Sequence, residues 1–488
     1  MSSKMTNLAY YCLFMALSVI MVTSKGLKEE FGWSRITYQG PEDNQLRSRA
    51  AFQLYKQGKY FGNKGRPKPN IGSPGIGGDA IFFEGDTNVA SANIRAPSSG
   101  SRRNSTNSGN VQNSQDNISY GTIDYRYENN IPMGANVWKD KLFITVPRRR
   151  LGVPSTLNYV PLGSEKRQNV PLIPYPSWDM NLYPDTSGSL DNFVSVYRIA
   201  IDVCDRMWFV DTGIVETLGN RTTVKPHQLV IINLQNDQVL HRFTLPENVL
   251  TPATVLASLT IDTPKGSCGD AFAYFPDLAG YGVIVFSLRE NRAWRVTHNY
   301  FFLEPLAGNF MIAGHSFQWN DGVFSVELSD IKSDGYRDMY FHAMAGTHMY
   351  KVSTRILRNQ TLATRSFHEN DFIVIGDRGP NSQTSTADIH KPTGTMFLGL
   401  VNQNAVGCWN INNDLSTISI VQKNDEKMIY PSDVKVSGDN VYVLTNTMPG
   451  FLYGRLNYDV INFRVWANDV RTAIEGTKCQ SRQAISYN

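Results

Sequence analysis

Acidic side chains are the strongest candidates for chemistry in this chain, because they recur at similar places in its apolar pattern. Four aspartates lie beside or just after short apolar runs, where strands would meet loops: Asp211, Asp277, Asp377 and Asp433. If these loops share one mouth of a channel, the carboxylates form a polar lining that attracts a cationic amine or polarises a catechol. Each aspartate alone is better explained as a turn residue that accepts backbone N–H groups. The prediction of a ligand site therefore depends on the four aspartates lying together.

The familiar catalytic signatures are missing from the sequence. It contains no Gly-x-Ser-x-Gly elbow, no His-Glu-x-x-His zinc helix and no phosphate-binding loop. His342 and His348 are close enough in sequence for a metal site, but ordinary strand and turn positions explain them better. We therefore predict no metal and no cofactor.

The acidic positions depend on strands that repeat along the chain. Apolar and aromatic runs, each ending at a turn residue, begin at Lys141, Met207, Phe272, Met339, Met396 and Asn440. Their starts are 66, 65, 67, 57 and 44 residues apart, and turn residues usually lead from each run into a second one. β-Branched and aromatic enrichment over such lengths is typical of strands, so the pattern predicts antiparallel hairpins repeated about six times.

Repeated sheets of this kind predict an all-β fold, a six-bladed β-propeller over residues 120–480. A β-sandwich array is an alternative, whereas a parallel β-helix would show repeats of roughly 20–30 residues, which the chain lacks. The segment 25–61, with a possible strand at Trp33, would complete the blade that holds the C-terminal strands. Residues 62–119 are rich in Gly, Ser, Asn and Pro, which predicts a disordered insertion near the N-terminus. Residues 481–488 form a tail.

The N-terminus predicts export. Residues 1–24 combine Lys4, an apolar run over 8–22 and small residues near a possible cleavage point, as in a secretory signal peptide. An uncleaved membrane anchor is the alternative, but no later segment reaches about 18 apolar residues, so we expect no membrane partner after cleavage. Sequons that could carry glycans in a secreted, extracellular protein lie at Asn104, Asn117, Asn220 and Asn359.

Charge and cysteine content narrow the partners and the compartment. The net charge is +4 over 488 residues without a basic stripe, so nucleic acid is not expected. The one tight basic run, 148–150, predicts a solvated turn over an anion site. Four cysteines follow the signal segment and predict two disulfides with three possible connectivities: Cys204, Cys268, Cys408 and Cys479. The sequence leaves the oligomeric state undetermined.

Five segments carry a resemblance to a known family: 131–160, 201–213, 268–309, 376–383 and 440–453. Long motifs within them, such as IDVCDRMWFVDTG at 201–213, resemble the insect Yellow / major royal jelly protein family. The resemblance covers residues 30 to 480 apart from the insertion. It implies a secreted six-bladed propeller and a role in cuticle melanin pigmentation, with conversion of dopachrome as a possible activity. Binding of biogenic amines without catalysis and a structural or nutritional role are the alternatives, because fold does not determine activity.

The resemblance also implies pairings and contacts. It implies the disulfides Cys204–Cys268 and Cys408–Cys479. Asn446 matches the strand end where amine-binding members place ligand contacts. The full set of expected ligand contacts in the channel is Asn446, Ser432, Met448, Gln383, Asn402, Asp211, Asp277 and Asp433. The expected ligand is a small aromatic amine or a catechol or indole compound, and a carboxylate base with a hydrogen-bond donor would suffice for tautomerisation of dopachrome.

Overall fold

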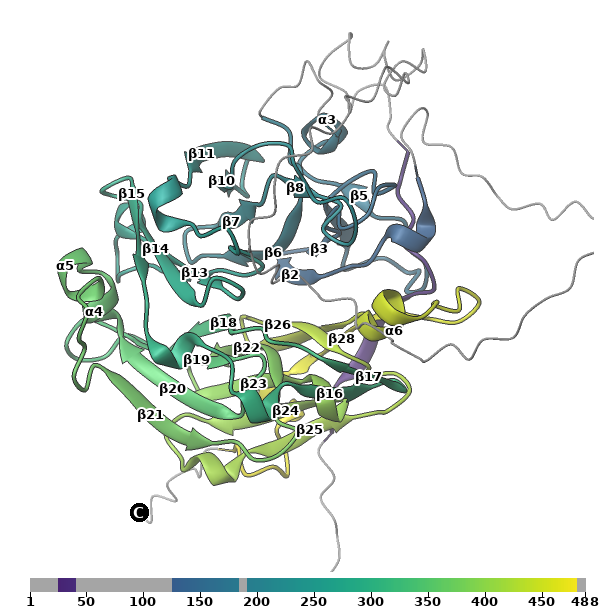
Figure 1. Cartoon of the computed structure of the whole chain (residues 1–488). Coiled ribbons are helices and arrows are strands. Elements are labelled where there is room, and N and C mark those ends of the chain that lie inside the picture. The colour runs from purple at the N-terminus through teal and green to yellow at the C-terminus, as the bar shows by residue number, and fades with distance from the viewer. Residues whose placement is uncertain (1–24, 41–124, 184–190, 481–488) are drawn as a thin grey trace, which may run out of the picture.

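The computed structural model describes residues 25–40, 125–183 and 191–480. Several sequence predictions lie outside these residues: the signal segment 1–24, the insertion 62–119, the sequons Asn104 and Asn117, and the tail 481–488. Six four-stranded antiparallel sheets surround a common centre (Figure 1), which confirms the all-β, six-bladed propeller.

Each blade is one four-stranded sheet, and its strands are named from the innermost outward. Blade 1 consists of β2 (Gly134–Trp138), β3 (Lys141–Thr145), β4 (Leu157–Pro161) and β5 (Ile173–Pro174). Blade 2 consists of β6 (Val196–Ile201), β7 (Arg206–Asp211), β10 (Gln228–Asn233) and β11 (Gln238–Thr244). Blade 3 consists of β12 (Thr260–Asp262), β13 (Phe272–Asp277), β14 (Gly282–Ser287) and β15 (Arg292–Val296). Blade 4 consists of β18 (Val323–Leu328), β19 (Asp338–Ala343), β20 (His348–Ser353) and β21 (Phe372–Asp377). Blade 5 consists of β22 (Thr384–His390), β23 (Thr395–Leu400), β24 (Ala405–Asn410) and β25 (Ser419–Lys423). Blade 6 consists of β26 (Pro431–Ser437), β27 (Asn440–Thr445), β28 (Phe463–Asp469) and β1 (Lys28–Trp33).

Short elements decorate the blades. Two further hairpins are β8 (Ile214–Val215) with β9 (Thr222–Thr223), and β16 (Asn309–Ile312) with β17 (His315–Gln318). The helices are α3 (Trp178–Asn181), α4 (Thr354–Leu357), α5 (Gln360–Ala363), α6 (Met448–Tyr453) and α7 (Val470–Ala473). The 3-10 turns are η2 (Tyr127–Asn129), η3 (Glu247–Val249), η4 (Cys268–Asp270), η5 (Asn299–Phe301), η6 (Pro305–Ala307), η7 (Val401–Gln403) and η8 (Leu415–Thr417).

The innermost strands form a closed ring of contacts, in the order β2, β6, β12, β18, β22, β26 and back to β2. The repeated apolar runs of the sequence are not these strands, because every run forms the second strand of its blade. The predicted position of the acidic set is therefore wrong in part. Asp211 and Asp277 end second strands, Asp377 ends an outermost strand, and only Asp433 lies on an innermost strand.

The N-terminal strand closes the ring. β1 pairs antiparallel with β28, so that Trp33 lies opposite Phe463. The indole N–H of Trp33 donates to the carbonyl of Val170 at 2.8 Å, and Gly32 bridges to Gln168. The chain start thus supplies the outer strand of blade 6 and contacts blade 1, which joins the first and last blades without a covalent link.

Apolar side chains fill the space between adjacent blades. Between blades 2 and 3, for example, Trp208 and Ile231 pack in one cluster with Phe275 and Ile284. Burial of such apolar surface contributes about 25 cal/mol per Å², so these contacts stabilise the packing of neighbouring blades. No helix in the described part of the chain is both long and apolar enough to cross a bilayer.

Two disulfides add covalent links, Cys204–Cys268 and Cys408–Cys479. Their pairing is the one that the family resemblance implies. The first joins the β6–β7 turn of blade 2 to η4 of blade 3, and the second fixes the chain end to β24.

The basic run at 148–150 lies largely inside the protein and contacts neighbouring segments, so the expectation of a solvated turn is wrong. Arg148 and Arg149 are buried. The guanidinium of Arg148 donates to five backbone carbonyls, including those of Phe193 and Val194 before β6. Burial lowers the pKa of Arg148 to about 10, but the group stays charged at neutral pH. It therefore fastens blade 1 to blade 2.

Candidate functional site

Charged side chains from the innermost strands meet at the centre of the propeller. Nε of Arg198, on β6, lies 3.6 Å from Oδ1 of Asp433, on β26. Nζ of Lys435, two residues along β26, lies 3.4 Å from the same oxygen. Oδ2 of Asp433 accepts the backbone N–H of Ala135 on β2 at 3.0 Å. Charge therefore alternates through the centre, and one carboxylate joins three blades.

The upper end of the channel, where the innermost strands begin, is packed with side chains. Asn446, Ser432 and Met448 are each 0% exposed, so no space as large as a water molecule borders them. Nδ2 of Asn446 donates to the carbonyl of Pro132 at 2.9 Å, and Sδ of Met448 accepts from Arg149 at 3.1 Å. The structure brings these three predicted contacts to one end of the channel, but a ligand could reach them only after side chains move.

Gln383 and Asn402 form a separate pair on blade 5. Nδ2 of Asn402 donates to Oε1 of Gln383 at 3.3 Å. Oδ1 of Asn402 accepts the backbone N–H of Met311 on β16, and Nε2 of Gln383 donates to the carbonyl of Ala307. The two amides therefore hold the segment around the β16–β17 hairpin against blade 5.

Asp211 and Asp277 are buried, and other groups of the protein form hydrogen bonds and ion pairs with both carboxylates. Asp211 accepts the backbone N–H groups of Val194 and Ser195, both at 2.8 Å. In blade 3, Asp277 accepts the N–H of Val255 at 2.9 Å and that of a turn glycine. Each also forms an ion pair at 2.9 Å, Asp211 with the buried Lys225 and Asp277 with the partly buried Arg295. Because buried carboxylates need such partners, these contacts explain both residues without a ligand.

An open cavity of about 540 Å³ occupies the lower end of the channel, where the innermost strands end. Five of the six blades line it, through segments 136–139, 200–203, 259–261, 387–392 and 435–439. This volume lies in the range of small-molecule sites in proteins. We refer to this space as the lower cavity.

The lower cavity contains groups suited to proton transfer. Asp388, on β22, accepts the backbone N–H groups of Ile389 and Val436, both at 2.8 Å. Burial nevertheless raises the pKa of the Asp388 carboxyl, and it lowers the pKa of the Lys391 ammonium. A carboxyl and an ammonium whose pKa values are shifted toward neutrality can exchange protons with a bound molecule.

A second carboxyl with a shifted pKa lies on β18. Glu327 is 2% exposed, and burial raises its pKa to about 8, so it is mostly protonated at pH 7. Oγ of Ser325 donates to its Oε1 at 2.6 Å, while Oε2 has no hydrogen-bond partner. Glu327 therefore contributes little negative charge near neutral pH.

Sequence reasoning missed Arg198, Glu327, Asp388, Lys391 and Lys435. A signal was present: in VFSVEL at 323–328 and SDVKV at 432–436, charged residues interrupt otherwise strand-like segments. Such residues predict strands that face a polar centre. Among the described residues, no group of three or more His, Cys, Asp or Glu side chains could hold a metal ion.

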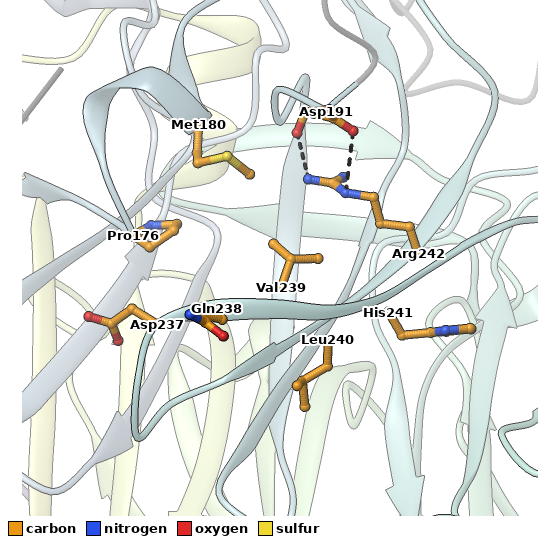
Figure 2. Close-up of a pocket in the computed structure, with 9 residues that line it drawn as sticks. All are labelled: Pro176, Met180, Asp191, Asp237, Gln238, Val239, Leu240, His241 and Arg242. Carbon is orange, nitrogen blue, oxygen red and sulfur yellow. Dashed lines mark hydrogen bonds and ion pairs between the residues drawn. The ribbon is translucent and has the colours of Figure 1, made fainter. Parts of the chain in front are cut away.

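A wider groove of about 620 Å³ lies on the outer edge of blade 2 (Figure 2). The guanidinium of Arg242, on β11, points to Asp191 and donates to its carbonyl at 2.6 Å. Oδ1 of Asp237 accepts from the hydroxyl of Tyr175 at 2.6 Å, and His241 contacts Asn291 at 3.0 Å. Because its main polar groups already have partners and the groove lies on the rim, we favour the lower cavity as the functional site.

Comparisons with known proteins agree with the fold and the blade motifs. Residues 194–479 match the family model described as major royal jelly protein. The chain is 40% identical to L-dopachrome tautomerase yellow-f of Drosophila melanogaster over 356 residues, which cover 72% of this chain and 82% of that protein. It is 40% identical to Protein yellow of Drosophila melanogaster and 41% identical to that of Drosophila subobscura, over 74% of this chain. The match spans 66% and 63% of the length of those two proteins.

Proposed function

The chain belongs to the Yellow / major royal jelly protein family, and on this basis we propose that it converts dopachrome in the melanin pigmentation pathway. The likeness to a dopachrome tautomerase over most of that protein's length carries the proposal. The lower cavity supports it, because it offers both an acid–base carboxyl and ammonium groups in a space of suitable size.

The reaction needs only proton transfers. In the conversion of dopachrome to its dihydroxyindole tautomer two C–H bonds of the five-membered ring break in succession, their electron pairs enter the ring system, and one O–H bond forms at each of the two quinone-type oxygens. No electrons leave the molecule, so no oxidant or reductant is required. In the proposed mechanism Asp388 takes the proton from carbon, and the ammonium of Lys435 donates to the oxygen.

The test is turnover by the purified full-length chain. We expect it to accelerate the loss of dopachrome's visible absorbance well beyond a heat-denatured sample, with a dihydroxyindole product identified by chromatography. Asp388→Asn should reduce the rate by about 100-fold or more, as is typical when a general base is removed. Asp140→Asn is the matched control, because this carboxylate lies on the β2–β3 turn, is 77% exposed and does not line the lower cavity.

Failure of this test would favour the other roles. If the native protein is no faster than the denatured sample, the enzymatic proposal for dopachrome is wrong. Calorimetry with dopamine, serotonin and indole compounds would then decide between a binding protein and a structural or nutritional one.

We further propose that the chain is secreted and glycosylated. Disulfides persist mainly in oxidising compartments, and the two in this chain fit that setting. Of the four sequons, Asn220 and Asn359 lie in the described part and are exposed. Expression in insect cells should place the protein in the medium, with glycan mass removable by an endoglycosidase at these asparagines. Retention of the intact chain inside the cells would contradict the proposal.

A further inference from the structure

We propose that the lower cavity selects planar aromatic or indoline molecules that carry a carboxylate, and that it disfavours cationic amines of similar size. This inference rests on the proposed function, since it takes the lower cavity as the substrate site. It reverses the charge preference that the aspartates suggested in the sequence.

Positive charge dominates among the groups that line the lower cavity. Three lysines contribute: Lys139, Lys391 and Lys435. Three aspartates oppose them, but Asp202 is neutralised by Arg206, whose Nε and Nη2 both lie 2.7 Å from its Oδ2. The two that remain are Asp388 and Asp439. Three ammonium groups against two carboxylates leave one positive charge.

The floor of the lower cavity does not offset this charge. Asp433 is shared between Lys435, one of the three lysines, and the buried Arg198. The pair of Arg198 and Asp433 is therefore neutral, and it provides no carboxylate free to attract an amine. Glu327 is mostly protonated near pH 7 and brings little negative charge.

Lys391 is the ammonium best placed to hold a carboxylate. Within the part of the chain that the structure describes, it forms no ion pair, and it lines the cavity. Lys391 is exposed to solvent, so an anion that enters the cavity can reach its ammonium. An ammonium without an ion-pair partner gains a charge-assisted hydrogen bond from a carboxylate that enters the site.

An aromatic wall lies beside the lysines. The indole N–H of Trp138 donates to Oδ1 of Asp205 at 2.7 Å, which fixes the ring at the edge of the cavity. Nζ of Lys139 lies 4.2 Å from the centre of this ring. Ile389 and Val436 supply further apolar wall. A flat ring system can therefore lie against Trp138 while its carboxylate reaches the ammonium groups.

Binding of stable probes tests the inference without turnover. We would titrate the full-length protein with indole-2-carboxylate, indole and tryptamine by calorimetry at neutral pH. We expect indole-2-carboxylate to bind at least about 10-fold more tightly than either of the others, and we expect this advantage to shrink as salt is added. Lys391→Gln should weaken indole-2-carboxylate by about 10-fold and leave indole unchanged.

Lys423→Gln is the matched control, because Lys423 lies on the outer strand β25 and its side chain is 53% exposed. It should bind all three probes as the native protein does. Equal or tighter binding of tryptamine, or no effect of Lys391→Gln, would overturn the inference. Dopachrome turnover is measured separately. Turnover without carboxylate preference refutes the selectivity alone, whereas carboxylate preference without turnover refutes the proposed activity alone.

Discussion

Nζ of Lys225 lies 2.9 Å from Oδ2 of Asp211, and both side chains are buried within blade 2. Removing one partner of a buried ion pair leaves a charge without compensation, which costs about 3–5 kcal/mol. We therefore expect Asp211→Asn to lower the free energy of unfolding by that amount, measured by urea denaturation. Ligand affinity per folded molecule should not change, as measured by calorimetry. If Asp211→Asn had normal stability but no longer bound the ligand, Asp211 would be a ligand-binding residue after all.

The contacts of Trp33 predict how the ring is closed. Its indole N–H donates to Val170, and its ring is 1% exposed between the outer strand of blade 6 and blade 1. Trp33→Ala should cost about 3–5 kcal/mol through the lost packing. Trp33→Phe keeps most of the bulk and loses the hydrogen bond, so about 1–3 kcal/mol is expected.

Hydrogen exchange locates the effect of these two variants. Both should increase exchange in β1 and β28 before the other blades, because β1 is the outermost strand of its sheet and pairs with β28 alone among the blade strands. Uniform exchange across all six blades would show that the contact stabilises the propeller without acting as its closure.

The fold was predictable because the second strands carry a strong local signal. Every residue of β7 is buried, since the strand is covered on both faces, and its sequence RMWFVD contains a continuous apolar run. Repetition of such runs gave the number of blades. The innermost strands gave a weaker signal, because β26 includes Asp433 and Lys435 and does not form an apolar run.

The candidate site was less predictable, because its contacts join distant parts of the chain. Asn446 donates to Pro132, which lies 314 residues earlier. The sequence places Asn446 at a strand end but cannot show that neighbouring side chains leave no space beside it. Likewise, Lys391 and Lys435 become neighbours of one cavity only when blades 5 and 6 close against each other.

The two disulfides provide a matched pair for testing how covalent links stabilise the ring. The linked cysteines are 64 and 71 residues apart, so the chain-entropy model assigns each about 4 kcal/mol. We expect the double variants Cys204→Ala/Cys268→Ala and Cys408→Ala/Cys479→Ala to lose similar free energies of unfolding in urea. If one pair contributes almost nothing while the other keeps the full value, restriction of the unfolded chain cannot be the main cause.

Glu327 predicts how stability depends on pH. Burial raises its pKa from 4.5 to about 8, so between these values the folded protein holds a proton that the unfolded chain has released. Stability from this group is therefore fully present below pH 4.5 and is lost as the pH rises toward 8. The loss is roughly 3 kcal/mol by pH 7. Glu327→Gln mimics the protonated form and should remove this slope.

Urea denaturation at pH 5 and pH 8 measures that slope. Between the two pH values the free energy of unfolding should fall more for the native protein than for Glu327→Gln. Any destabilisation by the glutamine itself is the same at both pH values and does not affect this comparison. Exposed Glu426 provides the control, since Glu426→Gln should keep the native slope. If the slope of Glu327→Gln equals the native one, Glu327 is ionised within the folded protein at neutral pH. It would then add a negative charge near the floor of the lower cavity, which would weaken the case for carboxylate selection there.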